Sequence, residues 1–528
     1  MKKIADHLSE VSSLHYLVLI IVGGFAFRAF ALDWGLPNDN PFHLASFHPD
    51  EMFGVISILY LIENPLSTTD YINTKGAGYF NLSAVFVYIA HLLDFISIKN
   101  GDIDDISSLQ NFYLVARFVN VILSTATIGL TYLVGKSLVD RKHGLLAALF
   151  VAISPVLIIS AHYVKSDTSE SLFILLSLYF AVQAKYNLKF IWCSMFFAGV
   201  AGAFKYPGIS AVVFGLISAL IFVKDIKSAL KYILGGVPFV ILGFLLVFPL
   251  PLFDLEQVAT GIYSEFYSKL TSGQNNQHLL NAALYPWYLA KMTGILFIAL
   301  VFLSSIFNLI HFNRYSLLLL PWFVIYAVIM SGSSLVVARY AVPGIPIASI
   351  LIAMMLFSAR EKYRNIIVVF VVATIVHLIS ISAVHLRSMN SIDPREAAAL
   401  WIKENVPHDG YVAITPSHDK DEFFTVPIDP RVHRPVNLMM RSDFNVSNYL
   451  KETNFNVIAI NESAWKTSTK QQSHLLFWQQ LESEWILKAQ FFNRPSWIGL
   501  PMEGDLPDDL YFLYQGVKIY EKRSLHKR

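Results

Sequence analysis

Charged residues are scarce in this chain of 528 residues, where Asp, Glu, Lys and Arg together make up 15%. Ordinary soluble proteins carry about 25%. Hydrophobic residues reach 55%, and the mean hydropathy is +0.51. This balance leaves too little polar surface for a soluble fold of such length. The sequence therefore predicts a polytopic α-helical membrane protein.

Cysteine is almost absent, and the basic residues form no extended pattern. The single Cys193 lies in an apolar segment, which excludes a disulfide framework and leaves the redox compartment unassigned. The net charge is only +2, and Lys and Arg stand in small clusters between the apolar segments. A nucleic-acid partner would require a basic stripe interleaved with aromatic residues, so this class of function is excluded.

Long hydrophobic segments dominate the first three quarters of the chain. A bilayer crossing needs about 20 mostly apolar residues, and such segments recur from Leu14 to Val384. When the clusters rich in Lys and Arg are placed in the cytoplasm, the chain threads the membrane consistently. Eleven transmembrane helices result, the first of them an uncleaved signal anchor, at residues 12–32, 109–136, 144–163, 168–185, 190–205, 207–223, 232–252, 284–310, 315–332, 342–358 and 365–385.

One further apolar stretch, Tyr79 to Ile96, would break this alternation if it crossed the membrane. We assign it to a re-entrant or juxtamembrane helix within a long exterior loop, residues 33–108. Beyond residue 386 the hydropathy falls, and mixed helix and strand patterns indicate an exterior soluble α/β domain at 387–528. The expected organisation is a transmembrane domain, residues 1–386, followed by this soluble domain.

The first polar motif, Phe47-His48-Pro49-Asp50-Glu51, comes soon after the first predicted span. Pro49 suits the opening turn of a helix, where the two carboxylates would simply complement the helix dipole. The functional alternative makes Asp50 a general base that takes a proton from an acceptor hydroxyl. Neighbours on a helix point about 100° apart, so Glu51 would instead position the substrate or help to bind a cation, with His48 as a substrate contact.

Metal binding is another use of the same stretch. His43 and His48 flank the carboxylates, but their spacing matches no closed zinc pattern. We therefore predict no dedicated metal site. Weak assistance by a divalent cation such as Mg²⁺ or Mn²⁺ stays open.

A second cluster, HYVKSDTSE at residues 162–170, lies between two predicted spans. Asp167 and Glu170 are spaced to share a helix face. The alternative is a solvated turn that caps the next helix, but a turn at the membrane interface does not require so many charges. We expect Lys165 to hold a phosphate, Asp167 to orient the acceptor or donor sugar during catalysis, and His162 and Glu170 to contact substrate.

Cations and tyrosines also gather at the exterior ends of the predicted spans. For each one alone, an ordinary belt of aromatic and snorkelling basic side chains is the alternative. Together they would supply the charge that a lipid-linked phosphate needs, because Arg grips two oxygens and Lys acts as a point charge. The set comprises Lys75, Arg117, Lys205 and Arg339 as phosphate ligands, and Tyr206 and Tyr340 as substrate contacts.

Five segments carry a family resemblance: FHPDE, SAHYVKSD, AGAFKYPG at 201–208, ARYAVPGIPIASILIA at 338–353 and AAALWIKENVPHDGYV at 397–412. They resemble the bacterial members of the protein O-mannosyltransferase and aminoarabinose transferase group, which are GT-C fold glycosyltransferases of family 39. HPDE also resembles the mannosyltransferases that build lipid-linked glycans, so it indicates the fold class rather than the acceptor.

The resemblance implies an integral-membrane enzyme of the bacterial inner membrane, with a sugar on a polyprenyl phosphate as donor. The acceptor would be a hydroxyl of a protein, lipid or glycan at the exterior, periplasmic face. By the same resemblance, Asp50 activates the acceptor for one displacement with inversion, and Lys205 and Arg339 stabilise the departing phosphate. The segment from Asn73 to Gly78 departs from the lysine-proline sequence of the aminoarabinose transferases, which weakens lipid A as the acceptor.

The soluble part and one rival function complete the expectations. We expect a helix from Pro394 to Glu404 and strands at 411–414, 457–460 and 517–520, forming a domain that covers the exterior site, recognises acceptor or is a structural cap. The main rival is a transporter or flippase of a lipid-linked sugar. Such proteins often show internal repeats and polar groups near the midplane, whereas this chain shows no repeat and gathers its polar groups at one face.

Overall fold

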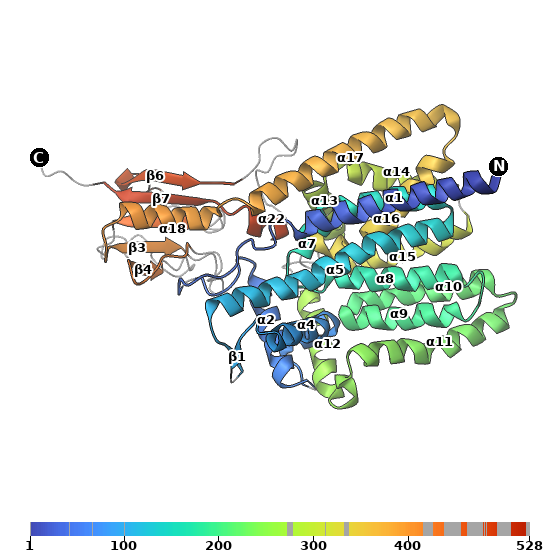
Figure 1. Ribbon diagram of the computed structural model, residues 1–528, viewed down its shortest axis with the longest axis horizontal. Coiled ribbons are helices and arrows are strands. Elements are labelled where there is room, and N and C mark those ends of the chain that lie inside the picture. The colour runs from blue at the N-terminus through green and yellow to red at the C-terminus, as the bar shows by residue number, and fades with distance from the viewer. Residues whose placement is uncertain are drawn as a thin grey trace, which may run out of the picture. The chain divides into compact units, whose positions relative to one another are not determined.

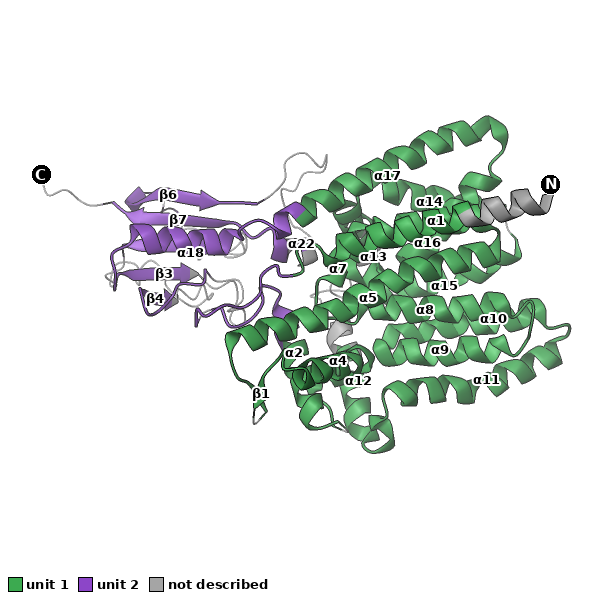
Figure 2. Ribbon diagram, viewed as in Figure 1, with its two compact units in different colours: residues 1–32, 53–386, 498–509 green, residues 33–52, 387–497, 510–528 purple. Residues whose placement is uncertain are grey.

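The computed structural model describes residues 2–41, 43–65, 67–99, 101–271, 278–311, 313–331, 337–415, 426–437, 456–461, 479, 481, 483–493 and 508–523. The chain forms two compact units, coloured separately in Figure 2. Unit 1 comprises residues 1–32, 53–386 and 498–509, and unit 2 comprises residues 33–52, 387–497 and 510–528. The segment 33–52 thus groups with the C-terminal part of the chain rather than with the helices that flank it in sequence.

Helices make up nearly all of the regular structure in unit 1 (Figure 1). The α-helices that lie in it wholly or mostly are α1 (Lys2–Ala29), α2 (Pro49–Glu63), α3 (Asp70–Lys75), α4 (Gly78–Leu92), α5 (Ile106–Leu138), α6 (Arg141–Ala152), α7 (Pro155–Ala161), α8 (Asp167–Gln183), α9 (Phe190–Phe204), α10 (Val212–Phe222), α11 (Ile226–Val247), α12 (Leu255–Thr271), α13 (His278–Thr293), α14 (Ile295–Ile310), α15 (Arg314–Ser331), α16 (Gly344–Ser358) and α17 (Glu361–Met389). Short 3-10 turns are η1 (Tyr206–Ala211), η2 (Leu250–Leu252) and η3 (Ala338–Ala341), and a small hairpin pairs β1 (Ile98–Lys99) with β2 (Asp102–Ile103).

The core of unit 1 lies where α8 packs against both α5 and α9 (Figure 1). Asp105 caps α5 by accepting a hydrogen bond from the Ser108 amide, and the helix then runs for 33 residues, about 50 Å. Because α8 is covered on several sides, its buried positions carry small or branched apolar residues such as Leu175 and Leu178. These helices form a rigid support for the polar segments at their ends.

The break between α6 and α7 shows how an interrupted span satisfies its backbone. The two helices meet at 56°, and Pro155 begins the second one. The break frees carbonyls at the end of α6, and the buried Arg28 of α1 donates to Val151 O and Ala152 O, each at 2.9 Å. Ser382 of α17 donates to the next carbonyl, Ile153 O, at 2.9 Å. The bend is therefore fixed by side chains from two other helices.

Each predicted transmembrane range coincides with a helix or a pair of helices. The range 144–163 contains the bend just described, 284–310 is divided between α13 and α14 at Gly294, whose φ is +84°, and 232–252 contains the end of α11 and the turn η2. Within the described residues, five helices are long and apolar enough to cross a membrane, or six if the bent pair counts as one span. The protein is thus a multi-pass helical membrane protein, and the exact number of eleven crossings stays a prediction.

The apolar stretch from Tyr79 to Ile96 is helical, as α4. The Tyr79 hydroxyl donates to Ala116 O of α5 at 2.8 Å. Its assignment to a re-entrant or juxtamembrane helix stays a prediction.

Unit 2 contains a mixed sheet of β3 (Tyr411–Thr415), β4 (Arg434–Asn437), β5 (Val457–Asn461), β6 (Trp485–Phe491) and β7 (Val517–Lys522), with α18 (Pro394–Asn405) and most of α22 (Asp508–Leu513). The strand order is β4-β3-β5-β7-β6; β3 is parallel to β4 and β5, and β7 is antiparallel to β5 and β6. Alternate residues of the strands, such as Val412 and Ile414, pack against Ala398 and Ile402 of α18. The predicted helix at 394–404 and the strands at 411–414, 457–460 and 517–520 are confirmed.

Candidate functional site

The segment between α7 and α8 carries its charged side chains into the protein. Lys165, Asp167 and Glu170 are all buried, although they come from a stretch that could have been a solvated turn. The two carboxylates lie in the first turn of α8, where the positive end of the helix dipole favours negative charge. Burial of three ionisable groups in one short segment requires compensating charges nearby.

Lys205, directly after the end of α9, supplies the nearest compensation. Its Nζ atom lies 2.5 Å from Asp167 Oδ1 and 4.0 Å from Glu170 Oε2. The same Nζ atom lies 4.6 Å from the ring centroid of Tyr340, in η3. The backbone of Lys205 is extended, so the chain leaves the direction of α9 at this residue and enters the turn η1. This point lies level with the first residue of α8.

Arg339 completes the cluster from η3. Asp167 interacts electrostatically with Arg339 and Lys165 as well as with Lys205. The guanidinium carbon of Arg339 lies 5.8 Å from the Tyr340 ring centroid. We call this set the Lys205 cluster; its members are Lys165, Asp167, Glu170, Lys205, Arg339 and Tyr340. Three cations face two carboxylates, so the cluster holds one positive charge in excess and suits an anion.

Asn120 of α5 holds the polar segment in place, and the sequence analysis missed it. Its amide nitrogen donates to Tyr163 O at 2.5 Å and to Lys165 O at 2.6 Å, while its Oδ1 accepts from the Thr168 hydroxyl at 2.7 Å. All of the side chain is buried. A lone Asn in the middle of an apolar helix was the signal that could have revealed it, since such a residue needs partners inside the protein.

An apolar pocket of about 570 Å³ lies beside the Lys205 cluster. Its walls come from α13, α14, α15, η3 and α16, with side chains such as Phe297 and Val301. Tyr340 belongs to both the pocket wall and the cluster. Unit 1 therefore places a cationic group next to a hydrophobic hollow, the two surfaces that an amphiphilic anion would need.

Lys75 is part of a second charged pair, close to the same end of α9. Both carboxylate oxygens of Glu265, in α12, lie 2.9 Å from Lys75 Nζ. The Tyr206 hydroxyl donates to Asn73 O at 2.7 Å, which ties this segment to the residue after Lys205. Gly76 has φ +102°, and a Cβ atom there would lie 2.8 Å from Phe204 O, so only glycine permits this close approach.

Arg117 and His162 are bonded to backbone where α1 ends. Arg117 is fully buried and its Nη1 donates to Leu32 O at 2.6 Å. The ring nitrogens of His162 lie 2.8 Å from Ile158 O and 2.7 Å from Phe30 O. These contacts give both residues a structural part, and their predicted contacts with phosphate and substrate stay predictions.

In unit 2 the Phe47-to-Glu51 motif opens helix α2, as its proline predicted. Glu51 is fully buried, and its Oε2 accepts a 2.6 Å hydrogen bond from the Ser46 hydroxyl. Asp50 is only half-buried, and its backbone amide donates to His48 Nδ1 at 3.3 Å. The two carboxylates thus differ in exposure, which suits a chemical role for Asp50 and a positioning role for Glu51.

Within the described part of the chain, no group of three or more His, Cys, Asp or Glu side chains is arranged to hold a metal ion. The expectation of weak assistance by a divalent cation stays a prediction.

Comparison with known proteins gives two kinds of similarity. Residues 109–250, which include most of α5 and all of α6 to α11, match the family model of dolichyl-phosphate-mannose-protein mannosyltransferase. No curated protein sequence gives a significant match. The matched range contains Asn120, Lys165, Asp167, Glu170 and Lys205.

Solved structures resemble the chain at low sequence identity. ArnT from Cupriavidus metallidurans, bound to undecaprenyl phosphate, has a TM-score of 0.50 and 13% identity over 96% of this chain and 97% of that chain. The archaeal oligosaccharyltransferase AglB from Archaeoglobus fulgidus, in complex with an inhibitory peptide and a dolichol-phosphate, has a TM-score of 0.46 and 13% identity over 94% of this chain and 75% of that chain. The predicted resemblance is confirmed: the chain has the GT-C fold and is similar to glycosyltransferases of the protein mannosyltransferase and aminoarabinose transferase group.

Proposed function

We propose that the protein is an inverting glycosyltransferase that moves a sugar from a polyprenyl phosphate to an acceptor hydroxyl. The observation that carries the proposal is the Lys205 cluster beside the apolar pocket in unit 1. A polyprenyl phosphate sugar has an isoprenoid tail for the pocket and a phosphate for the cations. The ligand named for the ArnT structure, undecaprenyl phosphate, has this chemistry.

The reaction we propose is a single displacement. Asp50 takes the proton of the acceptor hydroxyl, and the hydroxyl oxygen attacks the anomeric carbon of the sugar. The bond between that carbon and the phosphate oxygen breaks, so the configuration inverts and the polyprenyl phosphate leaves. Lys205, Arg339 and Lys165 stabilise the negative charge that develops on the leaving phosphate.

The remaining residues are proposed to bind and orient the reactants. Asp167 and Glu170 orient the sugar or the acceptor and also keep Lys205 in place through the ion pairs described above. Lys75 becomes a further phosphate ligand once it leaves Glu265. Tyr206 and Tyr340 lie beside these cations and provide ring surface for the donor.

We further propose that the reaction takes place at the exterior, periplasmic face of a bacterial inner membrane. This orientation rests on the distribution of Lys and Arg between the apolar segments. The acceptor is a hydroxyl on a protein, a lipid or a glycan. Unit 2, which carries the Asp50 motif, would then serve acceptor binding.

The test is transfer of radiolabelled sugar from a panel of polyprenyl phosphate sugars to a membrane extract. Wild type is compared with Asp50→Asn and with a control, Asp225→Asn, which makes the same change at the exposed N-cap of α11. Asn is as good an N-cap as Asp, so the control should fold normally. We expect transfer by the wild type and the control, and a loss of at least about 100-fold in Asp50→Asn. Equal turnover by all three proteins would reject Asp50 as the base.

A further inference from the structure

The segment that carries the proposed base belongs structurally to unit 2. Residues 33–52 pack with residues from 387 onward, although more than 300 residues separate them in sequence (Figure 2). The segment 33–52 includes Phe47 and His48, which directly precede the first turn of α2. Any interaction that fixes these two residues therefore also fixes where α2 begins.

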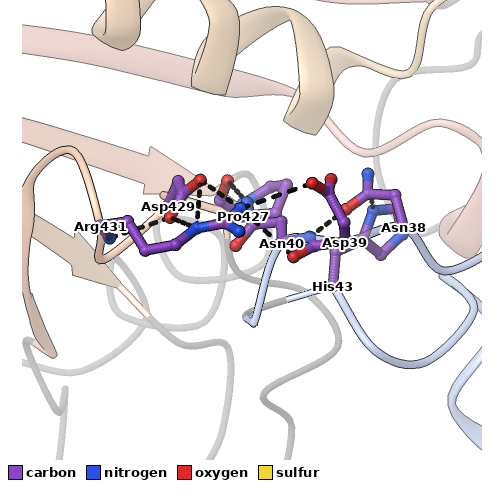
Figure 3. A network of polar contacts seen from close by, with 7 residues as sticks. All are labelled: Asn38, Asp39, Asn40, His43, Pro427, Asp429 and Arg431. Carbon is purple, nitrogen blue, oxygen red and sulfur yellow. Dashed lines mark hydrogen bonds and ion pairs between the residues drawn. The ribbon is translucent and has the colours of Figure 1, made fainter. Parts of the chain in front are cut away.

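Polar contacts secure the outer part of the segment (Figure 3). Asn40 Nδ2 donates to Pro427 O at 2.6 Å, and Arg431, which is paired with Asp429, also lies 3.7 Å from an Asp39 carboxylate oxygen. The Asn38 side-chain amide lies 2.9 Å from His43 Nδ1, within the same loop. The Arg431 contacts are exposed, so each contributes little by itself.

Arg395 of α18 makes the contact at the inner part of the segment. Its guanidinium is fully buried and donates to both carboxylate oxygens of Asp393, at 2.7 and 2.8 Å, and to Phe512 O at 3.0 Å. The guanidinium carbon lies 3.8 Å from the ring centroid of Phe47, directly in the range of a cation–π contact. On the following residue, the His48 ring lies 4.5 Å from the Phe512 ring.

These contacts form a closed set around the start of the motif. Asp393 neutralises Arg395 and also caps α18 through the Arg395 amide. The desolvated Arg395 guanidinium is stabilised by the face of the Phe47 ring, and moving the ring would leave a buried charge without that contact. The backbone carbonyl of Phe512 accepts a hydrogen bond from Arg395, and the Phe512 ring contacts His48. Side chains and backbone from helices of unit 2 thus hold the two residues before Pro49.

We propose that Arg395 is a positioning residue for the transfer reaction: through Phe47 and His48 it fixes the first turn of α2 and so the direction of the Asp50 carboxylate. This inference rests on the proposed function, in which Asp50 is the base. Arg395 touches neither reactant. Displacement of a catalytic group by about 1 Å can cost a factor of 100 in rate, so loss of this support should lower kcat while leaving the donor KM nearly unchanged.

The test uses the full-length protein with Arg395→Met, Phe47→Leu and the double variant. Arg434→Met is the matched control. It makes the same change at an exposed arginine on β4, whose side chain bonds to the Tyr411 hydroxyl rather than to the segment 43–52. One readout is the rate of hydrogen exchange in peptides covering residues 43–52. The other is the pair of values kcat and donor KM.

The inference predicts faster exchange at 43–52 in Arg395→Met and Phe47→Leu, and a kcat lower by about 10- to 100-fold. The double variant should lose no more than the worse single variant, because both changes remove the same contact. Unchanged exchange at 43–52, or losses in kcat that multiply, would overturn it. If Arg395→Met does not fold, Phe47→Leu decides by the same readouts. If the wild type transfers no sugar, the proposed function fails and the exchange rates alone decide whether Arg395 fixes the segment.

Discussion

Lys205 and Asp167 form a buried ion pair in which Nζ lies 2.5 Å from the carboxylate, and Glu170 is the next carboxylate to the same cation at 4.0 Å. The pair joins the end of α9 to the start of α8. This ion pair keeps the Lys205 cation beside the apolar pocket. When no phosphate is bound, the cation is still paired with a carboxylate.

Lys205→Met should therefore affect both stability and activity. Removal of one partner from a buried pair costs about 3–5 kcal/mol, and loss of a donor to the leaving phosphate lowers kcat by about 100- to 1000-fold. The double variant Lys205→Met/Asp167→Leu separates these effects, because it also removes the carboxylate that lies nearest to the lost cation. We expect it to regain most of the thermal stability but none of the transfer activity, and recovery of transfer would show that the Lys205 charge is dispensable.

Glu265→Gln should tighten donor binding. Glu265 holds Lys75 with two 2.9 Å contacts, and a phosphate must replace that carboxylate before Lys75 can bind it. The neutral amide of Gln competes less with the donor phosphate for Lys75, so the donor KM should fall by about 3- to 10-fold. Glu256→Gln, at an exposed position on the same helix, is the control. A donor KM that stays unchanged or rises in Glu265→Gln would argue against Lys75 as a phosphate ligand.

Asn120→Leu tests the support of the segment that carries Lys165 and Asp167. The change removes three hydrogen bonds and leaves two buried carbonyls short of a donor, which costs about 1–3 kcal/mol each. We expect a lower melting temperature and a kcat reduced by about 10- to 100-fold. Asn111→Leu on the same helix, where the side chain makes an exposed bond to Phe95 O, should change neither value much. Equal effects of the two substitutions would contradict a special role for Asn120.

His43 should make the stability of unit 2 depend on pH. Burial, aided by the nearby Arg395 charge, lowers the pKa of His43 from 6.5 to about 4, and the neighbouring Asp393 only partly offsets this. Glu396, whose own pKa burial raises, lies 3.8 Å from the ring. Between pH 6.5 and 4 the unfolded chain therefore binds a proton that the folded chain does not.

The free energy of unfolding should fall as the pH drops through that window, by about 3 kcal/mol in all, and should not depend on His43 above pH 7. His43→Phe keeps a ring stacked on Phe47, which His43 contacts at 4.3 Å, but cannot titrate. Its melting temperature should fall less between pH 7.5 and 4.5 than that of the wild type or of an exposed control, His408→Phe. Parallel curves for all three proteins would contradict the buried, neutral state of His43.

The fold was largely predictable because hydrophobic length and loop charge determine where helices begin and end. The prediction failed at breaks, where tertiary contacts decide. Nothing in the hydropathy of residues 284–310 distinguishes Gly294 from a tolerated helix glycine, and the bend before Pro155 depends on Arg28, 124 residues away from the Ala152 carbonyl it satisfies. Long-range side-chain bonds of this kind leave no mark in local sequence.

The sequence predicted which residues form the candidate site. It did not predict which other residues pair with them. The motifs identified Lys165, Asp167, Lys205 and Arg339, and unit 1 brings these together. The spacing of residues in the sequence could not reveal that Glu265 pairs with Lys75, because the two lie 190 residues apart. Nor could it reveal that residues 33–52 fold with the C-terminal part, since this depends on contacts such as Arg395 with Phe47.

The most direct test of the central claim uses a donor labelled twice, with ³H in the sugar and ¹⁴C in the polyprenyl chain, and the protein reconstituted in vesicles with a membrane extract as acceptor. A transferase separates the labels, so ³H should move to acceptor while ¹⁴C remains as free polyprenyl phosphate, in equal amounts and only with the wild type, not with Lys205→Met. Labels that stay together while the donor changes leaflet would contradict the account and identify a transporter of the intact lipid-linked sugar.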